Sequence, residues 1–179
     1  MMFLSNRLVL VTAAAALCWN LGAKAEDAKP VPAPMPSCDA LEYRQFDFWI
    51  GKWSVTEAKK PAGSNSIEPD LKRCALFESW SDVDGSRGRS INFYDRTLRR
   101  WHQSWIDDRG GALELNGGLV GGSMVLEGER LDMKANTSAR HRITWTPQPD
   151  GSVRQHWQMM KAGAGAWETV FDGLYMHSK

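Results

Sequence analysis

From residue 52 to the C-terminus, apolar and polar positions alternate in short runs that are separated by turn residues. A period of two is typical of strands with one face in a core and the other in water. Short runs of this kind, repeated along a chain, predict an all-β sandwich or barrel. The nine runs are 52–57, 73–81, 87–95, 99–107, 112–119, 123–129, 140–146, 152–160 and 166–176. Residues 64–70 can add a tenth strand, which Pro69 would end or restrict to a sheet edge.

The segments between the runs favour tight reversals. They contain Asp84-Gly85, residues 108–111, Gly121-Gly122, residues 148–151 and residues 163–165. Glycine, aspartate and proline in such places are typical of hairpin turns, and hairpins make neighbouring strands antiparallel. The chain therefore predicts an antiparallel β-barrel of nine or ten strands.

An aromatic segment precedes the first strand. Residues 46–53 read Phe-Asp-Phe-Trp-Ile-Gly-Lys-Trp, and Gly51 permits a tight turn between the aromatic side chains and the strand. Residues 39–50 are compatible with a short helix that has Asp39 as a candidate N-cap and ends at Gly51. We predict a short N-terminal helix and a bulky aromatic plug beside the barrel mouth.

Tryptophan and glutamine share a face on the central strands, because they recur at alternate positions. If this face points inward, the interior contains Trp101, Gln103, Trp105, Trp145, Gln155 and Trp157. Indoles with amides between them are suited to binding a small apolar or amphipathic molecule, which the amides would orient. Two alternatives stay open. Large aromatic side chains can fill a barrel completely, and a shift of one residue would reverse every face.

The first 25 residues have the form of a secretory signal. A basic start at 1–7 precedes an apolar run at 8–17, and residues 23–25 have the small-x-small pattern of a cleavage site. The apolar run is well short of the roughly 20 residues that span a bilayer as a helix. Residues 26–37 hold four spaced prolines and predict a stiff linker, which leaves 38–179 as a single folded domain. We expect a periplasmic or secreted protein.

Three cysteines are present, and Cys18 leaves with the signal. Bulky Leu17 before it disfavours a lipoprotein signal. Cys38 and Cys74 then enter an oxidising compartment as a pair, which predicts a disulfide between them; two buried free thiols are the alternative. No histidine or further cysteine lies at ligand spacing beside either one, so no metal site is expected.

Charge and motifs exclude several classes of function. Cleavage after residue 25 leaves 20 of the 22 basic side chains against 21 acidic ones, a net charge of −1. With export, this balance argues against a nucleic-acid partner. The sequence has no nucleophile elbow, zinc helix, phosphate loop or dinucleotide fingerprint, and it implies no cofactor.

Candidate acids and bases are scattered. The four histidines are His102, His141, His156 and His177. Each is explained best as a surface or cross-strand residue. Glu78, Asp107 and Glu114 lie on neighbouring central runs and could meet in space, although polar strand positions usually face water. An enzyme that uses Glu78, His102 or His156 as acid or base in a barrel pocket is therefore the second hypothesis.

Several motifs resemble an uncharacterised family of exported bacterial proteins with an FDFWxGxW pattern. They are residues 44–53, 92–95, 101–105, 142–147 and 153–157, within a match over about residues 38–176. The resemblance implies a lipocalin-like antiparallel barrel and no particular activity. The Gly51-x-Trp53 element is also similar to the opening of lipocalins and nitrobindins. Nitrobindin-like barrels bind haem through a histidine, but the motif around His177, its only positional analogue, does not match.

The sequence favours an exported lipocalin-like barrel that binds a small apolar or amphipathic molecule. The alternatives are an enzyme (a lyase, isomerase or hydrolase) that uses the pocket, and a filled barrel that acts through its outer surface. The ligand and the oligomeric state are not specified by the sequence.

Overall fold

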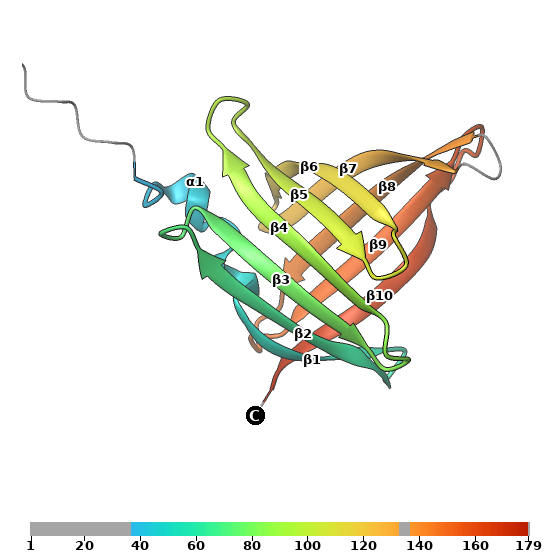
Figure 1. Ribbon diagram of the computed structural model, residues 1–179, viewed down its shortest axis with the longest axis horizontal. Coiled ribbons are helices and arrows are strands. Elements are labelled where there is room, and N and C mark those ends of the chain that lie inside the picture. The colour runs from blue at the N-terminus through green and yellow to red at the C-terminus, as the bar shows by residue number, and fades with distance from the viewer. Residues whose placement is uncertain (1–36, 133–136, 179) are drawn as a thin grey trace, which may run out of the picture. The chain divides into compact units, whose positions relative to one another are not determined.

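A computed structural model describes residues 37–132 and 137–178, and most of them form one closed antiparallel β-barrel (Figure 1). Within this part of the chain, ten strands follow one another around the barrel, and β1 closes it by pairing with both β2 and β10. The strands are β1 (Gly51–Glu57), β2 (Lys60–Asp70), β3 (Ala75–Asp82), β4 (Arg87–Asp95), β5 (Arg100–Asp107), β6 (Ala112–Val120), β7 (Ser123–Asp132), β8 (Thr137–Pro147), β9 (Val153–Lys161) and β10 (Glu168–His177). The predicted antiparallel barrel is confirmed. The predicted signal peptide (1–25) and nearly all of the predicted linker (26–37) lie outside the described residues.

The strand that the sequence leaves uncertain, β2, is longer than predicted. It starts at Lys60, opposite Glu57, and runs to Asp70. Sequence analysis places Pro69 at a sheet edge or a strand end, and the closed barrel has no edge. Pro69 instead lies one residue before the end of β2, where a missing N–H donor costs little.

The predicted short N-terminal helix is present before β1, and it consists of two short helical turns within residues 39–50. They are α1 (Leu41–Arg44) and the 3-10 helix η1 (Asp47–Trp49). Ala40 is the N-cap residue of α1 and no side chain caps it, so the assignment of Asp39 as the cap is wrong. A 3-10 turn has three residues per turn, which brings residues three apart onto one side. Phe46 and Trp49 therefore face the barrel together, and their rings stack with centroids 4.9 Å apart.

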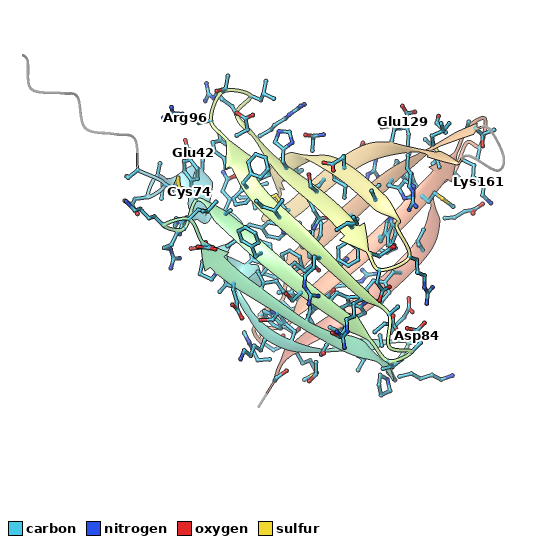
Figure 2. The ribbon with its side chains drawn as sticks, viewed as in Figure 1. Glu42, Cys74, Asp84, Arg96, Glu129 and Lys161 are labelled. Carbon is cyan, nitrogen blue, oxygen red and sulfur yellow. A yellow bond between two sulfur atoms is a disulfide. The ribbon has the colours of Figure 1, made fainter. Side chains whose placement is uncertain are left out.

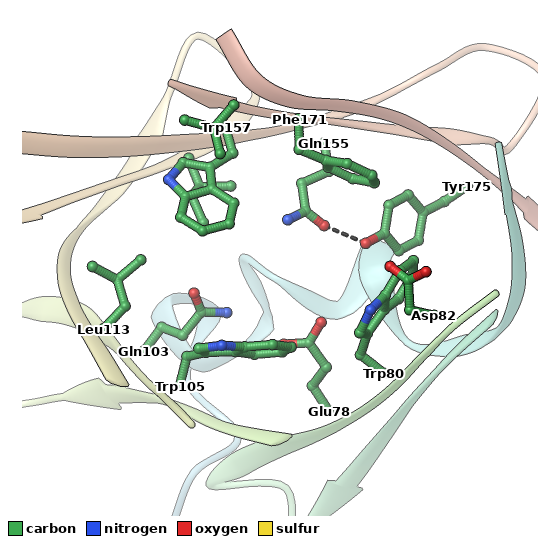
Figure 3. A pocket seen from close by; sticks show the side chains of 12 residues that line it. Glu78, Trp80, Asp82, Gln103, Trp105, Leu113, Gln155, Trp157, Phe171 and Tyr175 are labelled. Carbon is green, nitrogen blue, oxygen red and sulfur yellow. Dashed lines mark hydrogen bonds between the residues drawn. The ribbon is translucent and has the colours of Figure 1, made fainter. Parts of the chain in front are cut away.

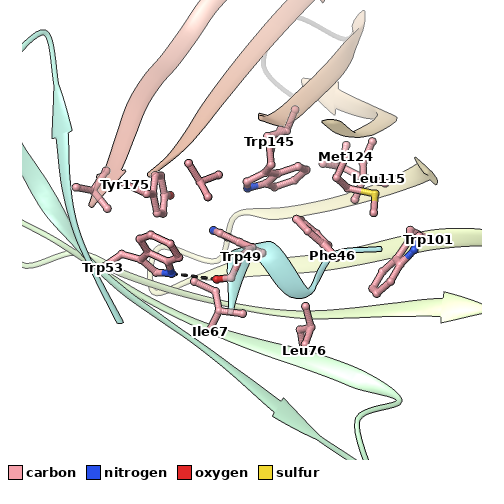
Figure 4. Close-up of a cluster of buried hydrophobic side chains, with 14 of the residues drawn as sticks. Phe46, Trp49, Trp53, Ile67, Leu76, Trp101, Leu115, Met124, Trp145 and Tyr175 are labelled. Carbon is pink, nitrogen blue, oxygen red and sulfur yellow. Dashed lines mark hydrogen bonds between the residues drawn. The ribbon is translucent and has the colours of Figure 1, made fainter. Parts of the chain in front are cut away.

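Phe46 and Trp49, here called the aromatic plug, close one end of the barrel (Figure 4). Neither side chain has exposed surface. The Phe46 ring meets Trp101 and Trp145 edge-on, at centroid distances of 5.6 and 5.1 Å. Trp53, the third residue of β1, donates its indole N–H to the carbonyl of Trp49 over 2.9 Å. These contacts fill this end of the barrel with aromatic rings.

One disulfide and one ion pair hold the segment that carries the aromatic plug to the barrel wall. A disulfide joins Cys38 to Cys74, the residue just before β3, with the Cα atoms 5.0 Å apart. The predicted pairing is thus present, and closing a loop of 36 residues contributes about 4 kcal/mol in the chain-entropy model. Asp47 of η1 also pairs with Arg73, at 2.7 Å from Oδ2 to Nη2. The plug is therefore tethered on both sides of α1.

Removing the ring of Phe46 should destabilise the protein strongly. We expect Phe46→Ala to lower the free energy of unfolding by about 3–5 kcal/mol, because it leaves a cavity among rings that cannot collapse into it. Urea unfolding monitored by tryptophan fluorescence measures this change. Phe77→Ala is the matched control, since Phe77 is exposed on the outer surface of β3 and should cost about 1 kcal/mol or less. Equal losses in the two variants would contradict a structural role for the plug.

Candidate functional site

A cavity of about 230 Å³ lies in the barrel end away from the aromatic plug (Figure 3). On β5, for example, Trp101 packs against the plug, while Trp105, four residues further along, lines the cavity. The lining consists of Glu78, Trp80, Asp82, Gln103, Trp105, Leu113, Ile143, Gln155, Trp157, Val170, Phe171 and Tyr175. The volume exceeds the roughly 150 Å³ that holds benzene and is below the roughly 300 Å³ where sites for drug-sized molecules begin. It suits one ring with a short chain.

Aromatic rings form much of the cavity wall, and three of them lie against glycine. The pairs are Trp80 with Gly63, Trp105 with Gly88, and Phe171 with Gly173. A Cβ atom built on Gly88 would stand 2.0 Å from the Trp105 ring, which is impossible without movement of the indole. The missing side chain at Gly88 therefore lets Trp105 lie along the wall instead of across the cavity.

Glu78 contributes a buried carboxyl group to the cavity. It lies on β3 between Leu76 and Trp80 and is 4% exposed. Asn65 on β2 donates its amide N–H to Oε1 over 2.7 Å, and Ser90 on β4 donates its hydroxyl to Oε2 over 2.6 Å. Burial raises the pKa of Glu78, and these two hydrogen bonds oppose the rise without cancelling it.

Both glutamines of the lining have one end engaged and one end at the cavity. Gln103 donates from Nε2 to Asn92 Oδ1 over 2.9 Å. Gln155 accepts at Oε1 from the hydroxyl of Tyr175. Burial, and next the charge of Glu78, raise the pKa of Tyr175 well above its ordinary value, so this hydroxyl stays protonated and donates. Within the described part of the chain, Gln103 Oε1 and Gln155 Nε2 have no other side-chain partner, and they present one acceptor and one donor to the cavity.

The six residues predicted to bind a ligand all lie inside the barrel, but at two depths. Gln103, Trp105, Gln155 and Trp157 line the cavity. Trp101 and Trp145 instead contact the aromatic plug and do not line the cavity. The filled and the hollow barrel, which sequence analysis treats as alternatives, thus describe opposite ends of one barrel.

The sequence patterns did not predict Trp80, Phe171 and Tyr175 as cavity residues, and they placed Glu78 in a barrel pocket only under the second, enzymatic hypothesis. A signal for β3 was available. In the run 73–81, alternation puts Glu78 and Trp80 on the same face as Leu76, which is buried. Because polar strand positions usually face water, the alternation alone did not lead to an inward assignment for Glu78.

The histidines lie outside the cavity. His102 stacks on Phe93 with centroids 5.1 Å apart, and His156 contacts Thr169 at 3.0 Å from Nε2 to Oγ1. His177 stacks on Trp53 at 3.9 Å, at the plug end of the barrel. No histidine in residues 37–132 or 137–178 lines the cavity.

His141 on β8 differs from the other histidines in being buried, with 5% of its surface exposed. Its Nδ1 accepts the indole N–H of Trp157 over 3.0 Å. Burial, and next the charge of Arg130, lower the pKa of His141. A neutral imidazole is what this acceptor role needs, so His141 holds the Trp157 ring in position at the cavity wall.

The three carboxylates considered from the sequence do not assemble. Glu78 is inside, whereas Glu114 is exposed and bonded to Ser104 on the outer surface. Asp107 accepts the backbone N–H of Gly111 over 2.7 Å and so serves the β5–β6 turn.

No protein-family model matches this chain, and a search of curated proteins finds no significant match. The ten-stranded antiparallel barrel is compatible with a lipocalin-like fold. Among the described residues, no group of three or more His, Cys, Asp or Glu side chains is arranged to hold a metal ion. The same residues include no helix with the length and apolar character needed to cross a membrane.

The buried carboxyl should make stability depend on pH. The pKa of Glu78 in the folded state is raised above its ordinary 4.5, so between these two values the folded protein binds the proton more tightly than the unfolded chain does. Its contribution is therefore full below pH 4.5 and is lost as the pH rises through the folded-state pKa.

We expect Glu78→Gln to lack this loss, so its free energy of unfolding relative to wild type should increase with pH above 4.5. Urea unfolding at stepped pH values measures the difference. Glu114→Gln, which removes a carboxyl group from the outer surface, is the matched control. A pH-independent difference for Glu78→Gln would contradict the raised pKa.

Proposed function

We propose that this protein binds a small molecule of about one ring's size, mostly apolar and with a polar group at one end. The observation that carries the proposal is the cavity, which combines aromatic walls with a few convergent polar atoms. An apolar wall with a small number of placed polar groups is the usual composition of a small-molecule site. A molecule seated between Trp105, Trp157 and Phe171 would direct its polar group toward Glu78.

The size of the cavity sets the expected affinity. For a ligand of about ten non-hydrogen atoms, the binding free energy per atom should lie between the limits for very small and for drug-sized molecules. This corresponds to a Kd on the order of micromolar. Gln103 Oε1 and Gln155 Nε2 would orient the polar end, because leaving either unpaired against a bound apolar group costs free energy.

Export of the protein to the periplasm or the medium belongs to the same proposal. The Cys38–Cys74 disulfide supports it, because disulfides persist in oxidising compartments. Membership of the exported FDFWxGxW family rests on the sequence motifs, with which the lipocalin-like barrel is compatible.

The second candidate function is catalysis with Glu78 as a general acid. A carboxyl group whose pKa is raised by burial, and which faces a cavity, is a recurrent feature of acid catalysts. Neither His102 nor His156 reaches the cavity, so Glu78 would act without a histidine partner. Conversion of a bound compound by wild type, and its absence in Glu78→Gln, would distinguish an enzyme from a binding protein.

Blocking the cavity mouth should abolish binding without disturbing the core. Val170 lines the cavity and is 42% exposed, so a larger side chain there can be accommodated at the surface. Across a panel of monocyclic alcohols, acids and amines, titrated by tryptophan fluorescence and calorimetry, we expect binders whose affinity falls at least about tenfold in Val170→Trp.

Leu174→Trp is the matched control for this experiment. Leu174 lies on the same strand, is similarly exposed, and does not line the cavity. Its affinities should equal those of wild type. Failure of every compound in the panel to bind wild type, or an equal loss in both variants, would contradict the proposed function.

A further inference from the structure

The cavity is lined by acidic and not by basic side chains among the described residues. Its lining includes two carboxyl groups, Glu78 in the interior and Asp82 nearer the end of β3. Within the described part of the chain, no lysine, arginine or histidine lines it. An anionic ligand would therefore meet repulsion and find no counter-charge.

On the cavity side, the groups of the described residues that face Glu78 from other strands are neutral. They are Asn65 on β2, Ser90 on β4, Gln103 on β5, Gln155 on β9 and the protonated Tyr175 on β10. Asp82, on its own strand, is the remaining charged group of the lining. Glu78 also forms no ion pair among the described residues, in contrast to Asp47 and Asp172, which pair with arginines. A buried carboxylate without a cation is costly, and a positively charged partner would relieve that cost.

The walls of the cavity also favour a cation. Trp80, Trp105 and Trp157 line it together, and the indole ring is the aromatic group that attracts cations most strongly through its face. This attraction grows when the cation is shielded from water, as it would be inside the barrel. Carboxyl and indole groups thus act in the same direction on a ligand's charge.

We propose that the ligand is a small organic cation, an ammonium group on a body of about one ring, whose charge pairs with the Glu78 carboxylate. This inference rests on the proposed binding function and deepens it. The ammonium N–H groups would donate to Glu78 and to Gln103 Oε1, and the apolar body would lie among the tryptophans. Asp82 would attract the cation as it enters.

Binding should also displace a proton. Burial favours the protonated form of Glu78 in the free protein, and an ammonium group beside it stabilises the carboxylate instead. Where the free carboxyl is protonated, each binding event therefore releases one proton from Glu78 to the buffer. Calorimetry in buffers of different ionisation enthalpy counts this proton.

Three probes of nearly the same shape test the proposal. They are 2-phenylethylammonium, which is positive, 2-phenylethanol, which is neutral, and phenylacetate, which is negative. On wild-type protein we expect the ammonium compound to bind at least about tenfold more tightly than the alcohol, and phenylacetate more weakly than both. This comparison needs no variant and so does not depend on how a variant folds.

Two isosteric substitutions locate the effect. Glu78→Gln should remove the preference for the ammonium compound over the alcohol and also the proton release. Glu114→Gln, on the outer surface, should keep both. A preference that survives in Glu78→Gln would overturn the assignment of Glu78 as the counter-charge.

The outcomes separate the two proposals. If the alcohol binds wild type as tightly as the ammonium compound, the cation proposal is wrong and the proposed binding function stands. If phenylacetate binds most tightly, the charge argument is reversed and the cation proposal is likewise wrong. If none of the three probes nor any compound of the wider panel binds, the binding function itself fails and the cation proposal fails with it.

Discussion

The width of a ten-stranded barrel is the constraint on which the rest of this structure depends. A barrel of eight strands is about wide enough for its own side chains to fill, and the diameter grows with each added strand. Ten strands therefore enclose more space than inward side chains alone can occupy. At one end the extra space is taken by a segment from outside the barrel, because Phe46 and Trp49 enter between Trp101 and Trp145. At the other end no segment of residues 37–132 or 137–178 enters, and a cavity is left.

A polar layer separates these two ends. Asn65, Glu78, Ser90, Asn92 and Gln103 come from four adjacent strands, and they bond to one another in a chain across the wall. Buried polar groups are tolerated when they are paired in this way. Both oxygens of Glu78 accept hydrogen bonds in this layer, but no basic side chain of the described residues pairs with the carboxyl group. Asn65 Oδ1 is buried in the same layer without a hydrogen-bond partner.

Period-two alternation, together with the turn residues between the runs, was sufficient to predict the antiparallel barrel. Alternation also grouped the tryptophans and glutamines of β5, β8 and β9 on shared faces, which lie inside the barrel. Alternation says which side of a strand a residue is on, but it gives no depth along the barrel axis. For that reason it could not separate Trp101 from Trp105, or Trp145 from Trp157. Depth is set by where the aromatic plug enters, and this depends on contacts between residues far apart in sequence, such as Phe46 with Trp145. The spacing of Phe46 and Trp49 did not reveal the 3-10 turn, because a short α-helix fits the same residues.

The cavity residues on β3 and β10 show the same limit in another form. Glu78 was a candidate acid from the sequence, yet its burial follows from Asn65 and Ser90 on the neighbouring strands, which satisfy its oxygens. Phe171 and Tyr175 alternate with Gly173 on β10, but a strand with a glycine in its middle gives a weak signal for a packed face. The disulfide, by contrast, followed from a count of two cysteines.

The glycines behind the cavity wall have an evolutionary consequence. At Gly88 and Gly173, an added methyl group would push an aromatic ring toward the cavity, and at Gly63 it would meet the Trp80 ring and also stand 2.4 Å from the Ser81 carbonyl oxygen. None of these three residues belongs to the cavity lining. If the cavity binds a guest as proposed, selectivity for its size can therefore drift through positions that the guest never touches, while the residues that meet it stay the same. If related barrels are compared only at the side chains that line the cavity, these glycine positions, which affect the cavity volume, are overlooked.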